Sequence, residues 1–194
     1  MKAVKRPSRG VTLIELLVVV TILGLLAVVA VPSFKRFIDV QRLRSVNAAL
    51  ITDIQFARSE AASRNTKVAL RFDLSGTMSC YVLLTGEVQL CDCSQQPGVN
   101  VCSGAGTREI RTVQVPSDTA IRMGAAQATS RVQFDPATGR IETATLDTFS
   151  PPLGPFRIEV SNPSIGGFVT SIEPTGRPST CSPSGQISGV PACS

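Results

Sequence analysis

Six cysteines, a few aspartates and one carboxylate in an apolar stretch are the side chains of this sequence that could do chemistry. The chain has no histidine, so it lacks both a common zinc ligand and the base that a thiol nucleophile needs. The segment "CDCSQQPGVNVC" could hold zinc through thiolates, but disulfides are its ordinary use in an exported chain. The aspartates stand at turns and strand ends, where turn formation explains them. We therefore expect no enzyme, no cofactor and no bound metal.

Glu15 is the carboxylate that needs an explanation. It is the single charge in the stretch 13–31, which is long enough to span a bilayer as a helix. A charged side chain at the bilayer centre costs about 2.5–3.5 kcal/mol. Basic residues just before such a stretch keep the N-terminus in the cytoplasm and export the rest of the chain; here they are Lys2, Lys5, Arg6 and Arg9.

The net charge of +5 is unevenly spread. The basic residues are concentrated in the leader and in the region up to Arg71, whereas the remainder is mildly acidic. A high pI with this distribution does not indicate general affinity for nucleic acid.

All six cysteines follow the apolar stretch, in the part of the chain that meets an oxidising compartment. Sequence proximity favours the disulfides Cys181–Cys193, Cys80–Cys91 and Cys93–Cys102. Because Cys91 and Cys93 point the same way in an extended chain, an exchange of these two partners is nearly as favourable.

A long helix must position Glu15. From Leu13 to about Asn65 only Pro32 interrupts the helical pattern. Beyond the apolar stretch, one apolar stripe recurs at helical spacing, and it consists of Leu43, Val46, Leu50, Ile54, Ala57 and Ala61. We assign the polar residues between them, including Asn47 and Asp53, to the other faces. The helix is therefore apolar all round in its first half and amphipathic in its second.

After Asn65 the pattern changes to short strands with period-two alternation, separated by turns rich in Gly, Pro and Ser. The expected strands are 67–73, 79–86, 109–115, 120–124, 131–135, 156–161 and 167–173. One helix followed only by strands predicts an α+β fold, in which antiparallel sheet packs on the helix stripe. From Pro174 onward the chain has no periodicity, and we expect a tail stapled by its own disulfide.

The region around Glu15 resembles the class III signal segment of type IV pilins and pseudopilins. A basic leader that ends in Gly10, Glu15 at the fifth position after it and a long apolar run carry this resemblance. It implies cleavage by prepilin peptidase between Gly10 and Val11, N-methylation of Val11, and pairing of Glu15 with the first amino group of a neighbouring subunit. Gly24 and Pro32 fall where pilins often carry helix-weakening residues.

The resemblance implies a single-pass protein of the inner membrane with its C-terminal domain in the periplasm, later incorporated into a filament of pilin subunits. The expected organisation is a leader (1–10), a transmembrane and assembly helix (11–32), the amphipathic half of the helix (33–66), a β-rich domain (67–173) and a tail (174–194).

A second resemblance, to the GspH/FimT group of minor pilins, rests on "ARSEA" at 57–61, "VQFDPATGR" at 132–140 and "SIEPTGRPSTC" at 171–181. It implies a minor subunit of a type IV pilus, at assembly initiation or at the tip. The alternative is a minor pseudopilin of a type II secretion system. We expect Arg58 and Glu60 to point to solvent or to a sheet edge.

Some minor pilins of this group bind DNA during natural transformation, through a Gly-Arg-x-Arg element beside a disulfide-bonded tail. The corresponding residues here begin with Gly176 and Arg177, but Ser179 stands where the second arginine is expected. Phosphate contacts add up electrostatically, so one arginine should bind more weakly, although Ser179 and Thr180 can donate to phosphate. The alternative is a turn with a solvated Arg177, and a double-stranded DNA partner therefore stays open.

Overall fold

The computed structural model describes residues 12–74, 78–86, 88, 91–96, 101–104, 106–126, 130–145, 148–183, 185 and 187–193. The chain divides into two compact units, Met1–Asp39 and Val40–Ser194. One helix, α1 (Leu13–Arg64), contributes to both units, and each unit is described by itself.

The first unit consists, in its described part, of the start of α1. Thr12 caps the helix, since its Oγ1 accepts a hydrogen bond from the Glu15 amide at 3.3 Å. The apolar side chains of this segment are exposed. Among the described residues no single helix is both long and apolar enough for a membrane span; Leu13–Val28 and Ser33–Arg64 together meet that requirement as a bent pair, by length and composition only.

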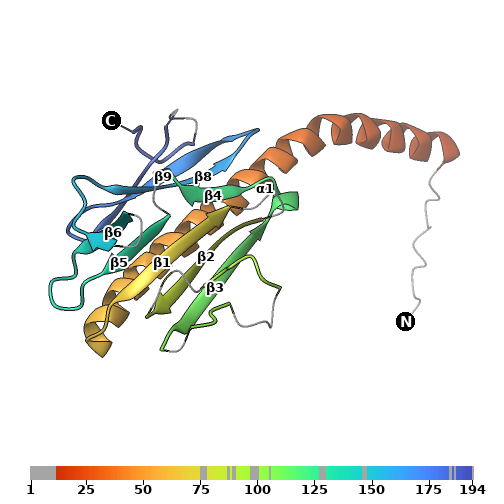
Figure 1. The fold of residues 1–194 in the computed structure, drawn as a ribbon. Helices are drawn as coiled ribbons and strands as arrows, with labels where there is room; N and C mark the ends of the chain where they lie inside the picture. The colour runs from red at the N-terminus through yellow and green to blue at the C-terminus, as the bar shows by residue number, and fades with distance from the viewer. Residues whose placement is uncertain are drawn as a thin grey trace, which may run out of the picture. The chain divides into compact units, whose positions relative to one another are not determined.

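The second unit contains two antiparallel sheets (Figure 1). The six-stranded sheet has the order β3-β2-β1-β5-β6-β7, from β1 (Val68–Leu74), β2 (Met78–Thr85), β3 (Arg108–Pro116), β5 (Arg131–Phe134), β6 (Ile141–Thr145) and β7 (Thr148–Ser150). The four-stranded sheet has the order β10-β9-β8-β4, from β4 (Arg122–Ala125), β8 (Phe156–Asn162), β9 (Gly166–Ile172) and β10 (Pro178–Cys181). A short 3-10 helix, η2 (Ser117–Thr119), follows β3. The α+β fold expected from the sequence is confirmed.

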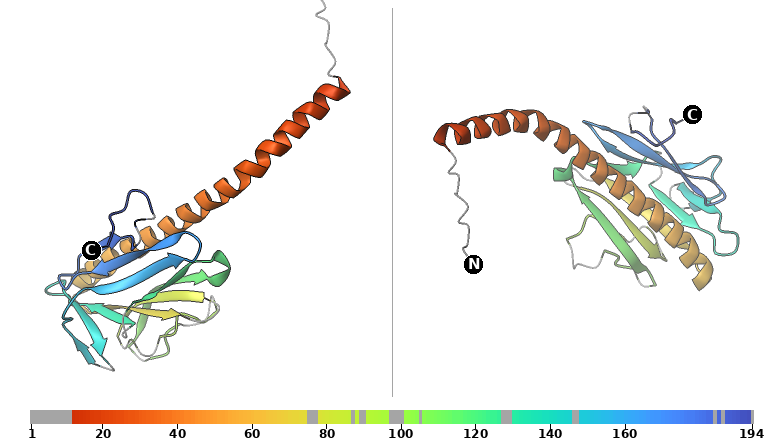
Figure 2. Two further views of the ribbon diagram at one scale, coloured as in Figure 1. Left: turned by 90° about the horizontal axis from the view of Figure 1, so that it is seen from above. Right: turned by 180° about the vertical axis from the view of Figure 1, so that it is seen from behind.

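Residues 40–64 of α1 lie against both sheets, which Figure 2 shows from behind. Five of the six stripe residues are completely buried: Leu43, Leu50, Ile54, Ala57 and Ala61. They share one core with the inner faces of β1 and β2 and with β8 and β9. The helix stripe therefore packs against the inner faces of both sheets within a single core.

Two polar residues of α1 are buried, contrary to the expectation that they lie on its solvent faces. Asp53 is 1% exposed; its carboxylate accepts hydrogen bonds from the Tyr81 hydroxyl at 2.7 Å and from Arg111 Nη1 at 2.9 Å. Asn47 Oδ1 accepts from Thr170 Oγ1 at 2.7 Å. Since a buried polar group is stable only with partners, each contact fixes the helix to one sheet, Asp53 to the first and Asn47 to the second.

The outer face of β1 and β2 is also buried, under the segment that follows β2. Ala69, Val82 and Leu84 form a second core cluster there with Val88, Val101 and the cystines. The disulfides are Cys80–Cys93 and Cys91–Cys102, together with Cys181–Cys193 in the tail.

The pairings Cys80–Cys91 and Cys93–Cys102 are therefore wrong, and the exchanged alternative is present. The reason is a short antiparallel contact in which Cys91 lies opposite Cys102, extended by a hydrogen bond of 2.8 Å from the Asp92 amide to the Val101 carbonyl. This contact leaves Cys93 to reach Cys80 on the outer face of β2.

Three strands were not expected: β6, β7 and β10. The edge strand β10 lies within the segment assigned to the tail. It pairs with β9 from Pro178↔Ile172 to Cys181↔Val169, so the tail begins as part of the second sheet. The loop beyond it is tied to α1, where Arg44 Nη2 donates to the Ser188 carbonyl at 2.6 Å.

Tyr81 provides a direct test of the buried contact to Asp53. Burial raises the pKa of its hydroxyl above the ordinary value, and the hydrogen bond to the Asp53 carboxylate raises it further. The unfolded chain loses this proton near pH 10 and the native chain does not. The contribution of Tyr81 to stability is therefore constant below about pH 10 and falls above it, by about 1.4 kcal/mol per pH unit.

The chain has one tyrosine and no tryptophan, so phenolate absorbance reports Tyr81 alone. In urea titrations from pH 8 to 11, we expect phenolate to appear only with unfolding, and Tyr81→Phe to abolish the alkaline loss of stability. Phenolate formation near pH 10 in folded protein would show that Tyr81 is not buried against Asp53.

Candidate functional site

Glu15 lies in the first turn of α1 with its side chain exposed. Among the described residues no ion pair or side-chain hydrogen bond engages its carboxylate. Gly10 and Val11, the expected cleavage and methylation positions, lie outside the described residues. Within the described part of the chain, then, no positive charge pairs with Glu15.

Gly24 and Pro32 lie within α1, whose backbone is helical from Leu13 to Arg64. A Cβ built at Gly24 would meet no atom within 4 Å, so no packing in this chain requires glycine there. The Pro32 side chain lies outside the described residues. The helix-weakening role of these two positions stays a prediction.

The predicted DNA element forms the tight turn between β9 and β10. The Gly176 amide donates to the Glu173 carbonyl at 2.7 Å, and the Glu173 amide donates to the Arg177 carbonyl at 3.0 Å. Gly176 has a φ of +80°, which favours glycine. The side chains of Arg177 and Ser179 are exposed, whereas the half-buried Thr180 hydroxyl lies 3.0 Å from that of Thr170.

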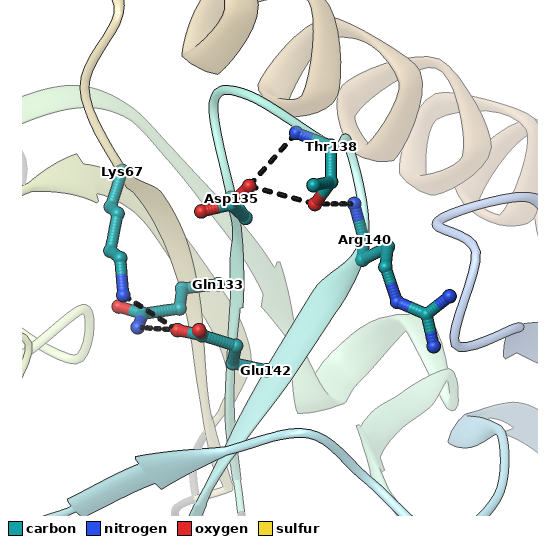
Figure 3. A network of polar contacts seen from close by, with 6 residues as sticks. All are labelled: Lys67, Gln133, Asp135, Thr138, Arg140 and Glu142. Atoms are coloured by element: carbon teal, nitrogen blue, oxygen red, sulfur yellow. Dashed lines mark hydrogen bonds and ion pairs between the residues drawn. The ribbon is translucent and has the colours of Figure 1, made fainter.

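A second turn, between β5 and β6, lies beside the first. Figure 3 shows how Asp135 closes it: its Oδ1 accepts hydrogen bonds from the Thr138 hydroxyl at 2.7 Å and the Thr138 amide at 2.8 Å. These bonds, led by the one from the hydroxyl, hold the pKa of Asp135 below its ordinary value. The two sheets meet here, because the Ile141 amide donates to the Pro174 carbonyl at 3.1 Å.

At the base of the second turn, Lys67 Nζ and Gln133 Nε2 both contact Glu142 Oε2, at 2.8 and 2.6 Å (Figure 3). Arg140 points away from this network. The Glu142 carboxylate thus already has two partners, Lys67 and Gln133.

The two turns and the last part of α1 enclose a groove of about 650 Å³. It is lined by Gln55, Arg58, Ser59 and Ala62 of the helix, by residues 136–139 and by residues 176–178. The floor of the groove is formed by backbone, where Gly139 and Gly176 approach each other closely.

Arg58 lies against this floor. A Cβ at Gly139 would lie 2.9 Å from Arg58 Nε, and one at Gly176 would lie 3.3 Å from it. The sequence predicts that Arg58 points to solvent or to a sheet edge. In the structure it is half-buried and faces the same groove as Arg177. Glu60, in contrast, pairs with Arg64 on the helix surface at 2.6 Å.

The groove is therefore electropositive. Within the described part of the chain, neither guanidinium, of Arg58 or of Arg177, has a hydrogen bond or an ion pair. A half-buried arginine without an acceptor, such as Arg58, is costly. Together with the exposed Arg177 on the same groove, it favours an anionic ligand. Sequence patterns could not find Arg58 as a partner of Arg177, because the two are brought together only by the packing of both sheets on α1.

No group of His, Cys, Asp and Glu among the described residues could hold a metal ion. The cystines account for every described thiol, since none is free.

Comparison with known proteins gives two family matches. Residues 47–167 match the family of type II transport protein GspH, and residues 5–31 match the prokaryotic N-terminal methylation motif. No curated protein matches the chain.

The solved structures that resemble the chain include the type IV minor pilin FimU of Pseudomonas aeruginosa in two crystal forms. One shares 17% identity with a TM-score of 0.47, over 72% of this chain and 87% of FimU. The other shares 18% identity with a TM-score of 0.45, over 71% of this chain and 91% of FimU.

The close approach at the groove floor can be tested with glycine substitutions. A methyl group at Gly176 would both strain a positive φ and strike the Gly139 backbone, so we expect Gly176→Ala to lower the free energy of unfolding by about 2–4 kcal/mol. Gly189 has a similar φ of +82° but open space around it, so Gly189→Ala should cost only about 1–2 kcal/mol. Equal losses in urea unfolding would mean that the two turns are not in contact.

Proposed function

Because this chain belongs to the GspH family, a family of structural pilin subunits and not of enzymes, we propose that it is a minor subunit of a type IV pilus. It is stored in the inner membrane through the first half of α1, cut after Gly10 and methylated at Val11. It then joins other pilin subunits at assembly initiation or at the tip. The observation that carries this proposal is Glu15, an exposed carboxylate without a partner among the described residues, in a helix segment whose neighbouring side chains are apolar and exposed.

The proposed role of Glu15 follows from its charge and position. Once the leader is removed, Glu15 lies about one helical turn from a new amino terminus and close to the membrane interface. Its partner is the amino group of a neighbouring subunit's first residue. At 4 Å and an effective dielectric constant near 20, such a pair is worth about 4 kcal/mol, and it forms only when two subunits are in register.

The alternative machine is the type II secretion pseudopilus, which the name of the matched family favours. The chemistry at Glu15 is the same in both cases. Immunolabelling of sheared pili and of the secretion apparatus shows which filament contains the protein, and this decides between the two machines.

Glu15→Gln tests the assembly role because it removes the charge and keeps the shape. We expect unchanged membrane levels and at least a 10-fold loss of the subunit from purified filaments, which corresponds to about 1.4 kcal/mol or more. Asp39→Asn, which removes another carboxylate of the same unit, should assemble normally. Normal incorporation of Glu15→Gln would contradict the proposal.

A second function, DNA capture by the same minor pilin, is favoured by one observation. Ser179 stands where the second arginine of the DNA element is expected. Arg58 faces the groove beside Arg177 and supplies a second positive charge there. Two guanidinium groups on one groove match the charge and the bidentate geometry of a phosphate. We propose double-stranded DNA as the ligand of this groove.

A gel-shift titration with detergent-solubilised protein tests the DNA proposal. We expect Arg58→Ala and Arg177→Ala each to weaken binding about 10-fold and to lower the slope of log K against log salt by about 0.9. Arg108→Ala, at an exposed position of β3 outside the groove, serves as the control. The absence of a shift at low salt, or equal effects from all three variants, would rule out this groove as the DNA site.

A further inference from the structure

The segment 34–38 of α1, "FKRFI", has a composition that the assembly role of the helix does not explain. It ends the apolar half with two aromatic and two basic side chains. Phe34 is 64% exposed and Phe37 is 57% exposed. Their ring centroids lie 6.4 Å apart, as expected for positions one turn apart on one helix face.

The distance of this segment from the helix start matches a bilayer. From Leu13 to Phe34 a helix advances about 31 Å at 1.5 Å per residue, and the hydrocarbon core of a bilayer is about 30 Å thick. The stretch is bent between Val28 and Ser33, so this length is measured along α1. When the start of α1 lies at one interface, Phe34 and Phe37 therefore come near the other. Aromatic side chains are enriched at that level, although Trp and Tyr are the usual residues.

The basic side chains of the segment make no ion pair within the described part of the chain. Lys35 and Arg36 are exposed and make no ion pair or hydrogen bond with any described residue. Asp39 is close in sequence, yet it forms no ion pair with either of them within the described part of the protein. Both cations are thus available at the level where lipid phosphates lie.

We infer that residues 34–38 bind the headgroups of anionic phospholipids in the outer leaflet of the inner membrane. Lys35 and Arg36 contact the phosphates, and Phe34 and Phe37 lie at the boundary with the acyl chains. The segment thereby fixes the depth of the helix, so that Glu15 stays at the opposite interface until a neighbouring subunit pairs with it. This inference rests on the proposed membrane storage of the subunit.

The test uses the full chain carrying Phe37→Trp, which introduces the only tryptophan of the chain. The protein is reconstituted in vesicles of 70% phosphatidylcholine and 30% phosphatidylglycerol. Two sets of these vesicles are compared. In one set only phosphatidylglycerol is brominated near the headgroup, and in the other only phosphatidylcholine is, with the same fraction of brominated lipid in both. The ratio of tryptophan quenching gives the relative affinity of the segment for the anionic lipid.

Two basic residues near an anionic surface support a preference of about 5- to 30-fold for phosphatidylglycerol. In the same background, Lys35→Gln with Arg36→Gln should bring the ratio close to 1. Arg108→Gln with Arg122→Gln, which removes two exposed arginines of the second unit, should leave the preference unchanged.

Equal quenching by both lipids, or a preference that survives Lys35→Gln with Arg36→Gln, would overturn the inference while leaving membrane storage intact. Flotation of the vesicles separates the two claims. Protein that does not float with the vesicles would contradict the membrane storage in the proposed function itself, and the lipid contact with it.

Discussion

The burial of one helix stripe is the constraint on which the second unit depends. Leu43, Leu50 and Ile54 are fully buried, and the inner faces of both sheets pack around them. The inner face of each sheet is apolar and must be covered, and the stripe of α1 contributes to covering both. The positions of these stripe residues therefore also determine where the two sheets lie on α1.

The buried polar contacts of α1 make this arrangement specific. An apolar stripe alone tolerates rotation of the helix, since hydrophobic contacts have little directionality. Asp53, held by Tyr81, and Asn47, held by Thr170, each have one geometry in which they are satisfied. A rotated helix would leave both without partners, at a cost that hydrophobic burial does not offset.

The arginine groove is a consequence of the same packing. The β5–β6 and β9–β10 turns belong to different sheets, and their glycines come together because both sheets end at the same part of the helix. Arg58 is therefore placed beside Arg177 by tertiary structure.

Much of the fold could be predicted from local patterns, and the failures share a cause. The helix and seven strands follow from apolar periodicity. The strands β6 and β10 were not predicted because "IETAT" and "PSTC" carry few large apolar residues. They form by pairing with the neighbouring strands β5 and β9. The burial of Asn47 and Asp53 could not be predicted, because their partners lie far away in the sequence. The disulfide partners of Cys91 and Cys93 could not be chosen either, because they depend on a loop contact that the spacing of the cysteines does not encode. Glu15 could be found from its spacing alone, whereas Arg58 could not be linked to Arg177 without the structure.

The central claim is that Glu15 pairs with the first amino group of a neighbouring subunit. A membrane-permeant carbodiimide joins a carboxylate to an amine only when the two are in contact, and mass spectrometry identifies the linked peptides. We expect an amide between Glu15 and the N-terminal residue of another pilin in assembled filaments, and none in membranes that hold only unassembled subunits. Filaments in which Glu15 is recovered without such a link, while other ion pairs are cross-linked, would contradict the account.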